Sequence, residues 1–307
     1  MKTQGRLFAW LQLFRLPNVF TAAADVTMGF LVTNPLGNLE PNLHFGMLVA
    51  SSCLLYLSGM VLNDVFDAEV DAREQPGRPI PSGRVSLGTA KAAGWGLWTA
   101  GVFVAWSLSW IANDWRPGTV ASFLAACIVM YDYNLKRSRF APLIMGECRF
   151  LNVLLGMSLM ILPWGKFELL LAAGIGIYVV GVTVFARTDA HMSARSRLLC
   201  GFAVLVGGMG ILAATPWLTF YRPQLAIPLK GWYILWAALM LITARRCLMA
   251  IFEPTSPRVQ AAVRHCVLSI IVLDAAVCVG YVGPFWGFVV LALLFPSMLL
   301  ALWLKAT

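Results

Sequence analysis

Residues 44–71 read HFGMLVASSCLLYLSGMVLNDVFDAEVD, an apolar run that ends in a dense group of carboxylates. At 1.5 Å per residue, the apolar part at 44–62 is long enough to cross the hydrocarbon core of a bilayer, which is roughly 30 Å thick. Runs of this kind recur along the whole 307-residue chain. They predict an all-α integral membrane protein and exclude a transmembrane β-barrel, whose strands would alternate polar and apolar residues.

The composition points the same way. Hydrophobic residues make up 60% of the chain and charged residues 12%, whereas soluble domains carry about 25% charged residues. This balance excludes a water-soluble globule, a nucleic-acid binder and a disordered tail. The seven cysteines form no CxxC pair and are interpreted as small buried hydrophobes.

Nine membrane spans are expected, within one membrane domain that covers residues 1–307. A tenth apolar stretch, 285–304, is either a further span or a continuation of the ninth. The expected spans are 14–33, 44–62, 89–112, 118–135, 142–163, 168–186, 197–217, 230–250 and 262–282.

The basic residues predict the orientation. With the N-terminus in the cytoplasm, 17 Lys and Arg residues lie at the N-terminus and in the cytoplasmic loops, and four lie in the opposite loops. Such a bias is typical of the positive-inside rule. We expect a multi-pass protein of the cell inner membrane whose N-terminus and polar loops are cytoplasmic.

The carboxylates after the second span form the most informative pattern. Asp64, Asp67 and Asp71 follow i, i+3, i+7 spacing, which places them on one face of a helix. A divalent cation such as Mg²⁺ would relieve their repulsion and share its other ligands with a phosphate. A solvated acidic helix end is the alternative, but five of the 14 acidic residues crowd into positions 64–74.

The next segment, 73–84, combines three arginines with three prolines and two glycines. Proline and glycine end a helix and favour an ordered loop. Arginine suits bidentate contact with phosphate, so carboxylates and arginines together predict a diphosphate site. The alternative, that the arginines only set topology, leaves the proline-rich spacing unexplained.

The pattern resembles the UbiA superfamily of intramembrane prenyltransferases. Residues 63–71 match the family's NDxxDxxxD box, and 78–83 match its R-P-x-x-x-G loop. Residues 15–18 (RLPN) are similar to its R-x-P-N motif, and 131–137 are similar to its Y-x-x-x-K region with looser spacing.

The resemblance implies a nine-helix bundle around a central cavity that opens to the cytoplasmic side. There, Mg²⁺ and an isoprenyl diphosphate of geranyl to geranylgeranyl length would bind, with the prenyl tail near membrane lipid. Metal ligands would be Asp64, Asp67, Asp71 and Asp189, with Lys136 also catalytic. The residues expected to bind the diphosphate are Asn18, Asn63, Arg78, Arg137, Arg187 and Arg195.

The second acidic motif of the family departs from the pattern here. In the segment 185–197, Asp189 stands alone where two or three aspartates are expected. Arg187, His191 and Arg195 bring positive or titratable groups instead, so we expect a reduced second metal site with arginine taking part of its role. His191 is a metal ligand, a proton acceptor or a residue of a solvated loop.

This variant looks most like the bacterial branch called EboC, whose gene clusters also encode a sugar-phosphate-cyclase-like enzyme. That likeness implies a small acceptor with many hydroxyl groups on a ring, a cyclitol. Arg149 lies within a span, so it is either cavity-lining or paired with Glu147. The acceptor-side candidates are Asp132, His191, Arg149 and Asp25.

Two other functions remain open. A UbiA-type terpene cyclase would ionise the same diphosphate without an acceptor. A membrane transporter would place ionisable residues near the bilayer midplane, whereas the acidic box lies at the end of a span. The sequence leaves the prenyl chain length and the oligomeric state undetermined.

Overall fold

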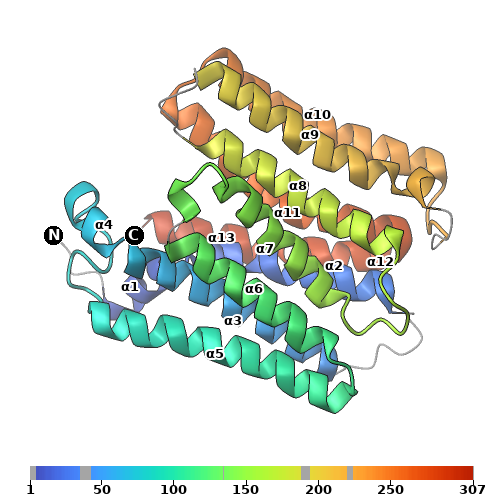
Figure 1. Ribbon diagram of the computed structural model, residues 1–307. Helices are drawn as coiled ribbons and strands as arrows, with labels where there is room; N and C mark the ends of the chain where they lie inside the picture. The colour runs from blue at the N-terminus through green and yellow to red at the C-terminus, as the bar shows by residue number, and fades with distance from the viewer. Residues whose placement is uncertain (1–4, 35–42, 134, 188–193, 220–223, 307) are drawn as a thin grey trace.

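The computed structural model describes residues 5–34, 43–133, 135–187, 194–219 and 224–306. These residues form an elongated bundle of long helices that run side by side (Figure 1), which confirms the all-α prediction. The long helices are α2 (Val19–Thr33), α3 (Leu43–Phe66), α5 (Leu87–Ala112), α6 (Arg116–Tyr133), α7 (Ala141–Gly156), α8 (Lys166–Ala186), α9 (Ala194–Leu218), α10 (Leu229–Phe252) and α11 (Ser256–Tyr281). The shorter ones are α1 (Arg6–Leu13), η1 (Leu16–Asn18), α4 (Ala68–Glu74), η3 (Leu135–Arg137), α12 (Pro284–Ala292) and α13 (Leu294–Ala306).

Among the described residues, eight helical segments are long and apolar enough to cross a membrane. They correspond to seven of the nine expected spans and to the tenth stretch. The fourth and fifth expected spans form α6 and α7 but fall outside this set. The predicted end of the fifth span at residue 163 is wrong, because α7 stops at Gly156.

The tenth stretch is separate from the ninth span. Gly283, with a φ of 123°, lies at the turn between α11 and α12, a backbone conformation that favours glycine. Helix α12 then packs against α11. Helix α13 follows after a break at Leu293, where Pro296 has no N–H to continue the helical ladder. The segment therefore returns along the bundle (Figure 1).

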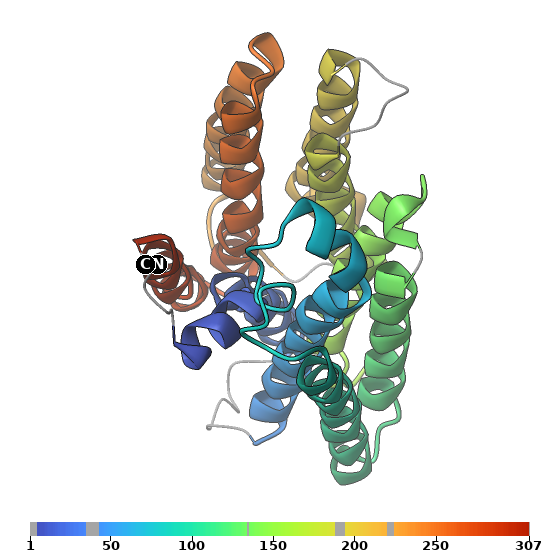
Figure 2. The ribbon, with the colours of Figure 1, turned by 90° about the vertical axis from the view of Figure 1, so that its left-hand side faces the viewer.

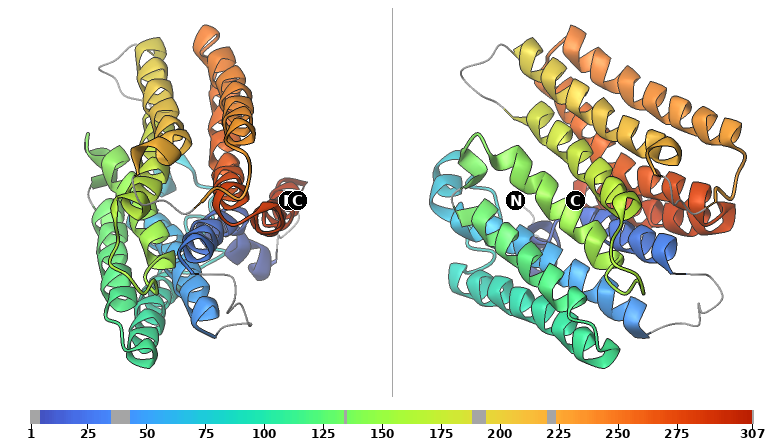
Figure 3. Two further views of the ribbon diagram at one scale, coloured as in Figure 1. Left: turned by 90° about the vertical axis from the view of Figure 1, so that its right-hand side faces the viewer. Right: turned by 45° about the vertical axis from the view of Figure 1, so that its right-hand side comes forward.

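Glycines allow the central helices to approach closely. A Cβ on Gly156 of α7 would overlap the backbone of Val26, and one on Gly29 of α2 would lie 2.6 Å from the carbonyl oxygen of Val153. Small residues at such contacts are typical of membrane helix packing. Figure 3 shows α9 and α10 as an outer pair, on the side of the bundle away from α5.

One end of the bundle is covered by short elements. Figure 2 looks at this end, where α1, α4 and the loop after α4 lie across the ends of the long helices. The ring centroids of Phe8 and Trp303 lie 6.0 Å apart, so this contact packs α1 against α13. A small apolar core beneath them includes Leu13, Val65 and Ile80. This core holds the loop that carries Arg78.

Candidate functional site

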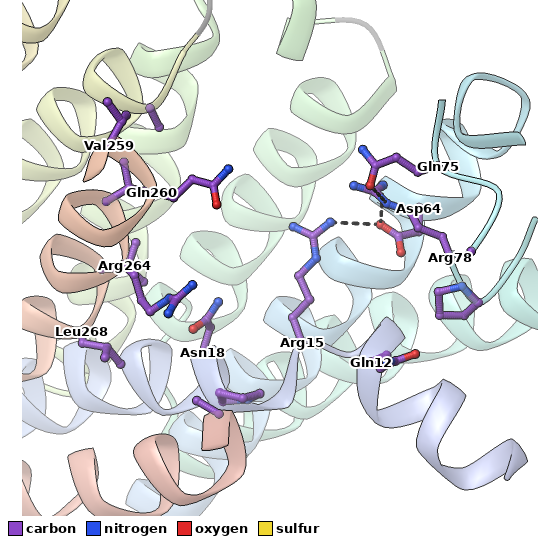
Figure 4. A pocket seen from close by; sticks show the side chains of 17 residues that line it. Gln12, Arg15, Asn18, Asp64, Gln75, Arg78, Val259, Gln260, Arg264 and Leu268 are labelled. Carbon is purple, nitrogen blue, oxygen red and sulfur yellow. Dashed lines mark hydrogen bonds and ion pairs between the residues drawn. The ribbon is translucent and has the colours of Figure 1, made fainter. Parts of the chain in front are cut away.

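A cavity of about 900 Å³ opens at the covered end of the bundle. Its polar wall comes from η1, α3 and the loop after α4, and its apolar wall comes mainly from α11 (Figure 4). The polar side chains that line it are Gln12, Arg15, Asn18, Asp64, Gln75, Arg78, Gln260 and Arg264. The apolar ones include Val259, Val263, Val267 and Leu268. A ligand with an anionic head group and an apolar tail would match these two walls of the cavity.

Asp64 is the centre of the polar wall. Its Oδ1 atom lies 3.1 Å from Nη2 of Arg15 and 3.7 Å from Nη1 of Arg78. The carboxylate is almost fully buried, whereas the Arg15 side chain is 41% exposed and extends across the cavity toward Asp64 (Figure 4). Arg15 adopts a left-handed backbone conformation with φ 44° and ψ 46°, which costs an L-residue about 1 kcal/mol or more.

Asp71 is joined to the same site through Arg78. The Nη1 atom of Arg78 donates a hydrogen bond of 2.6 Å to Oδ2 of Asp71, and Nε donates one of 2.9 Å to Gln75. The loop that carries Arg78 is held in turn by Arg84, which donates to Oε1 of Gln12 at 3.0 Å. The predicted ordered loop is therefore present.

Asp67 lies apart from the other two carboxylates. Its Oδ2 atom pairs with Nζ of Lys136 at 2.7 Å, and its Oδ1 atom lies 3.5 Å from Nη2 of Arg137. Asp67 does not line the cavity. The prediction of one shared helical face is wrong here, because α3 ends at Phe66 and Asp67 occupies the turn before α4.

Within the described part of the chain, no three His, Cys, Asp or Glu side chains lie close enough to hold a metal ion together. Asp64 and Asp71 do share one positive group, because Nη1 of the Arg78 guanidinium lies 3.7 Å from Asp64 and 2.6 Å from Asp71. One or two carboxylates plus substrate phosphate oxygens are a usual ligand set for Mg²⁺. The residues present therefore fit a Mg²⁺ ion that arrives with a phosphate.

The remaining predicted diphosphate residues divide into three groups. Asn18 lines the cavity, whereas Asn63 faces the other side of α3. Arg187 donates to the carbonyl oxygen of Ser138 at 2.9 Å, and Arg195 donates to that of Phe252 at 3.2 Å. Neither of these arginines lines the cavity, so their role in diphosphate binding stays a prediction. Asp189 and His191 lie outside the described residues.

Two of the acceptor-side candidates lie at a second, smaller chamber of about 200 Å³ between α2, α3, α6 and α7. Arg149 and Asp132 both line it. Arg149 pairs through Nη1 with Oδ2 of Asp25 at 2.8 Å, so its partner is Asp25 and the predicted alternative of Glu147 is wrong. Asp132 accepts a hydrogen bond of 2.9 Å from Asn63.

Three residues at the cavity received no role from the sequence. Arg15 was part of a matched motif, yet only the fold shows that it contacts Asp64. Arg264 and Gln260 reach the cavity from α11, opposite Arg15 (Figure 4). The sequence did show Arg264 as a charged residue near the start of the expected span 262–282. The direction in which its side chain points depends, however, on how α11 packs.

Comparison with known proteins identifies relatives over part of the chain. The digeranylgeranylglyceryl phosphate synthase of Saccharolobus solfataricus is 34% identical over 134 residues, which is 44% of this chain and 45% of that protein. The synthase of the same name from Methanothrix thermoacetophila is 40% identical over 96 residues, or 31% and 33% of the two chains. The matches thus span less than half the length of these relatives.

Solved structures share the fold over nearly the whole chain. A structure reported for digeranylgeranylglyceryl phosphate synthase in membranes aligns with a TM-score of 0.65 at 20% identity, covering 90% of this chain and 98% of that one. A UbiA homologue from Archaeoglobus fulgidus bound to DMAPP and Mg²⁺ aligns with a TM-score of 0.64 at 11% identity, covering 92% and 99%.

The model of the UbiA prenyltransferase family matches residues 23–258. This range includes the acidic box, the loop with Arg78 and α3, α6 and α7 around the inner chamber, whereas η1 and nearly all of α11 lie outside it. The chain belongs to the UbiA prenyltransferase family.

Proposed function

We propose that the protein is a Mg²⁺-dependent intramembrane prenyltransferase that ionises an allylic isoprenyl diphosphate and transfers the prenyl group to a small acceptor. The observation that carries this proposal is the cavity of about 900 Å³ in which Arg15 and Arg78 lie opposite α11, which contributes Arg264 and most of the apolar wall. A diphosphate suits the arginines, and a prenyl chain suits the valines and leucine of that wall.

Asp64 and Asp71 would hold the Mg²⁺ ion, which adds positive charge beside the leaving diphosphate when bound. Arg78 now bridges these two carboxylates at 3.7 and 2.6 Å. A metal ion at this position would free the Arg78 guanidinium for the phosphate oxygens. The Archaeoglobus fulgidus homologue was solved with DMAPP and Mg²⁺ bound, which supports a Mg²⁺ ion together with the donor.

The arginines of the cavity would stabilise the diphosphate as the C–O bond breaks. Arg15 and Arg78 reach it from the side of Asp64, and Arg264 reaches it from α11 (Figure 4). Such preorganised charges lower the barrier because they need no rearrangement during the reaction. Lys136 and Arg137, which pair with Asp67, form a second positive group that Asp67 holds in place.

The donor is proposed to fall in the geranyl to geranylgeranyl range. The relatives are named digeranylgeranylglyceryl phosphate synthases, which favours the long end of that range and a glyceryl phosphate acceptor. The EboC-like likeness favours a cyclitol acceptor instead. We also propose that the site lies on the cytoplasmic side of the inner membrane, because the arginines that line it belong to the basic side of the chain.

Product analysis tests the reaction class. Purified protein in nanodiscs would receive geranyl, farnesyl or geranylgeranyl diphosphate with Mg²⁺, with and without a pool of glycerol phosphates, cyclitols, quinols and aromatic acids. We expect diphosphate release with a mass shift of one prenyl group on an acceptor. A cyclised hydrocarbon formed without acceptor would indicate a terpene cyclase, and intact diphosphate in every mixture would contradict the proposal.

A further inference from the structure

The 200 Å³ chamber lies directly behind the donor cavity. Arg15 lines both spaces, and two consecutive residues of α3 face one space each: Asp64 lines the donor cavity and Asn63 lines the inner chamber. A group bound in the inner chamber would therefore lie beside the place where the diphosphate is proposed to bind. The Arg15 side chain, held by Asp64 at 3.1 Å, stands between them.

Both arginines that line the chamber already have carboxylate partners, Asp64 for Arg15 and Asp25 for Arg149. Nη1 of Arg149 donates to Asp25, Nη2 donates to Oγ1 of Thr21, both at 2.8 Å, and the guanidinium lies 5.8 Å from the centre of the Tyr56 ring. Asp25 has no exposed surface, so this ion pair is shielded from water. Arg149 thus offers little free charge to an incoming anion.

One carboxylate oxygen at the chamber, in Asp132, lacks a hydrogen-bond donor among the described residues. Asp132 is 3% exposed and lines the chamber. Its Oδ1 atom accepts from Asn63 at 2.9 Å, whereas its Oδ2 atom is buried without a hydrogen bond among the described residues. A buried acceptor without a partner is costly. A hydroxyl group of a ligand would satisfy it, and a phosphate or carboxylate would be repelled by it.

We infer that the inner chamber binds the hydroxyl-bearing end of an uncharged acceptor, and that Asp132 takes the proton of the attacking hydroxyl. This inference rests on the proposed function. In the step, the acceptor oxygen forms a bond to C1 of the prenyl group, and the bond from C1 to the diphosphate oxygen breaks. The electron pair leaves with the diphosphate, and the hydroxyl proton moves to Oδ2 of Asp132. The chain would thus differ from relatives whose product is named as a phosphate ester.

The first test uses Asp132→Asn. The asparagine carbonyl can still accept the hydrogen bond from Asn63, but its NH₂ group replaces the free acceptor oxygen. We expect acceptor prenylation to fall about 100-fold or more, while binding of farnesyl S-thiolodiphosphate with Mg²⁺ changes less than about twofold. Transfer that survives this substitution would overturn the role of Asp132. Asp114→Asn, at a carboxylate outside both cavities, is the matched control.

The second test compares neutral acceptors with their phosphate esters. Glycerol monoether and myo-inositol would each be offered beside the corresponding phosphate. We expect kcat/KM for the neutral member to exceed that for the phosphate at least about tenfold, because like charges are disfavoured. Preference for the phosphates, or transfer to none of the hydroxyl acceptors, would overturn the inference.

A second variant, which fills the chamber with a larger side chain, tests the inference even if Asp132→Asn fails to fold. Met60 lines the chamber without contributing a polar group, so Met60→Trp should block the acceptor and leave the affinity for the donor analogue intact. Loss of both properties would argue against a separate acceptor chamber. If wild-type protein neither binds nor ionises any donor, the proposed function fails as well. Donor ionisation without the expected acceptor effects would defeat this inference alone.

Discussion

The guanidinium of Arg15 lies 3.1 Å from the carboxylate of Asp64 and connects two motifs that are 49 positions apart. This contact joins η1 to α3 at the point where the donor cavity and the inner chamber meet. Arg15 keeps this position with a left-handed backbone. Such backbone conformations are often found where function requires a fixed side chain.

The Arg15 side chain is expected to strengthen donor binding, while its left-handed backbone lowers the stability of the fold. Arg15→Ala and Arg15→Gly both remove the guanidinium and should weaken donor binding about 10- to 100-fold. Glycine tolerates φ 44°, so we expect Arg15→Gly to be more stable than Arg15→Ala by about 1 kcal/mol. Titration with a donor analogue and thermal unfolding of both variants test this. Equal melting temperatures would contradict the strain argument.

Gly156 allows the close packing of α2 against α7. Gly156→Ala would place a methyl group against the backbone of Val26 and should destabilise the protein by about 1–3 kcal/mol. Gly207→Ala is the control, because a Cβ at this helical glycine of α9 meets nothing within 4 Å. Thermal unfolding in one detergent should show a lower melting temperature only for Gly156→Ala. A similar loss for both would argue against close packing of α2 and α7.

Asp114 predicts a pH dependence at the other end of the bundle. Hydrogen bonds from Arg116 lower the pKa of Asp114, and Arg116 also donates to the carbonyl oxygen of Leu162 at 3.0 Å. A lowered pKa stabilises the fold above the ordinary aspartate value of about 3.9, and this contribution is lost as the pH falls through the lowered value. Asp114→Asn should reduce the melting temperature at pH 7, and the difference from wild type should vanish at acid pH. A difference that stays constant as the pH falls from 7 to well below the ordinary aspartate value of about 3.9 would contradict this.

The orientation of the chain predicts a labelling pattern. Ser82 lies in the loop after α4, and Leu162 lies in the segment after α7, where it is 64% exposed. In intact cells, a membrane-impermeant maleimide should label Leu162→Cys at once and Ser82→Cys only after permeabilisation. The parent chain gives the background from its seven cysteines. The reverse pattern would place the donor cavity outside the cytoplasm.

The sequence predicts the helical bundle well, because a bilayer leaves few other structures possible. It also identifies Asp64, Asp71 and Arg78, which lie together in the structure. It fails for Asp67, since ideal helical spacing does not anticipate the turn after Phe66. The pairing of Arg149 with Asp25 joins residues 124 positions apart and depends on the approach of α2 to α7, which spacing along one helix does not encode.

Calorimetric titration of the purified protein with farnesyl S-thiolodiphosphate tests the central claim most directly, since this analogue cannot ionise readily. The account predicts binding that requires Mg²⁺, is lost in Asp64→Asn and Asp71→Asn, and is retained in Asp114→Asn, whose carboxylate pairs with Arg116 outside the cavity. Binding of equal strength without Mg²⁺, or unchanged binding in Asp64→Asn, would contradict the assignment of this cavity as the donor site.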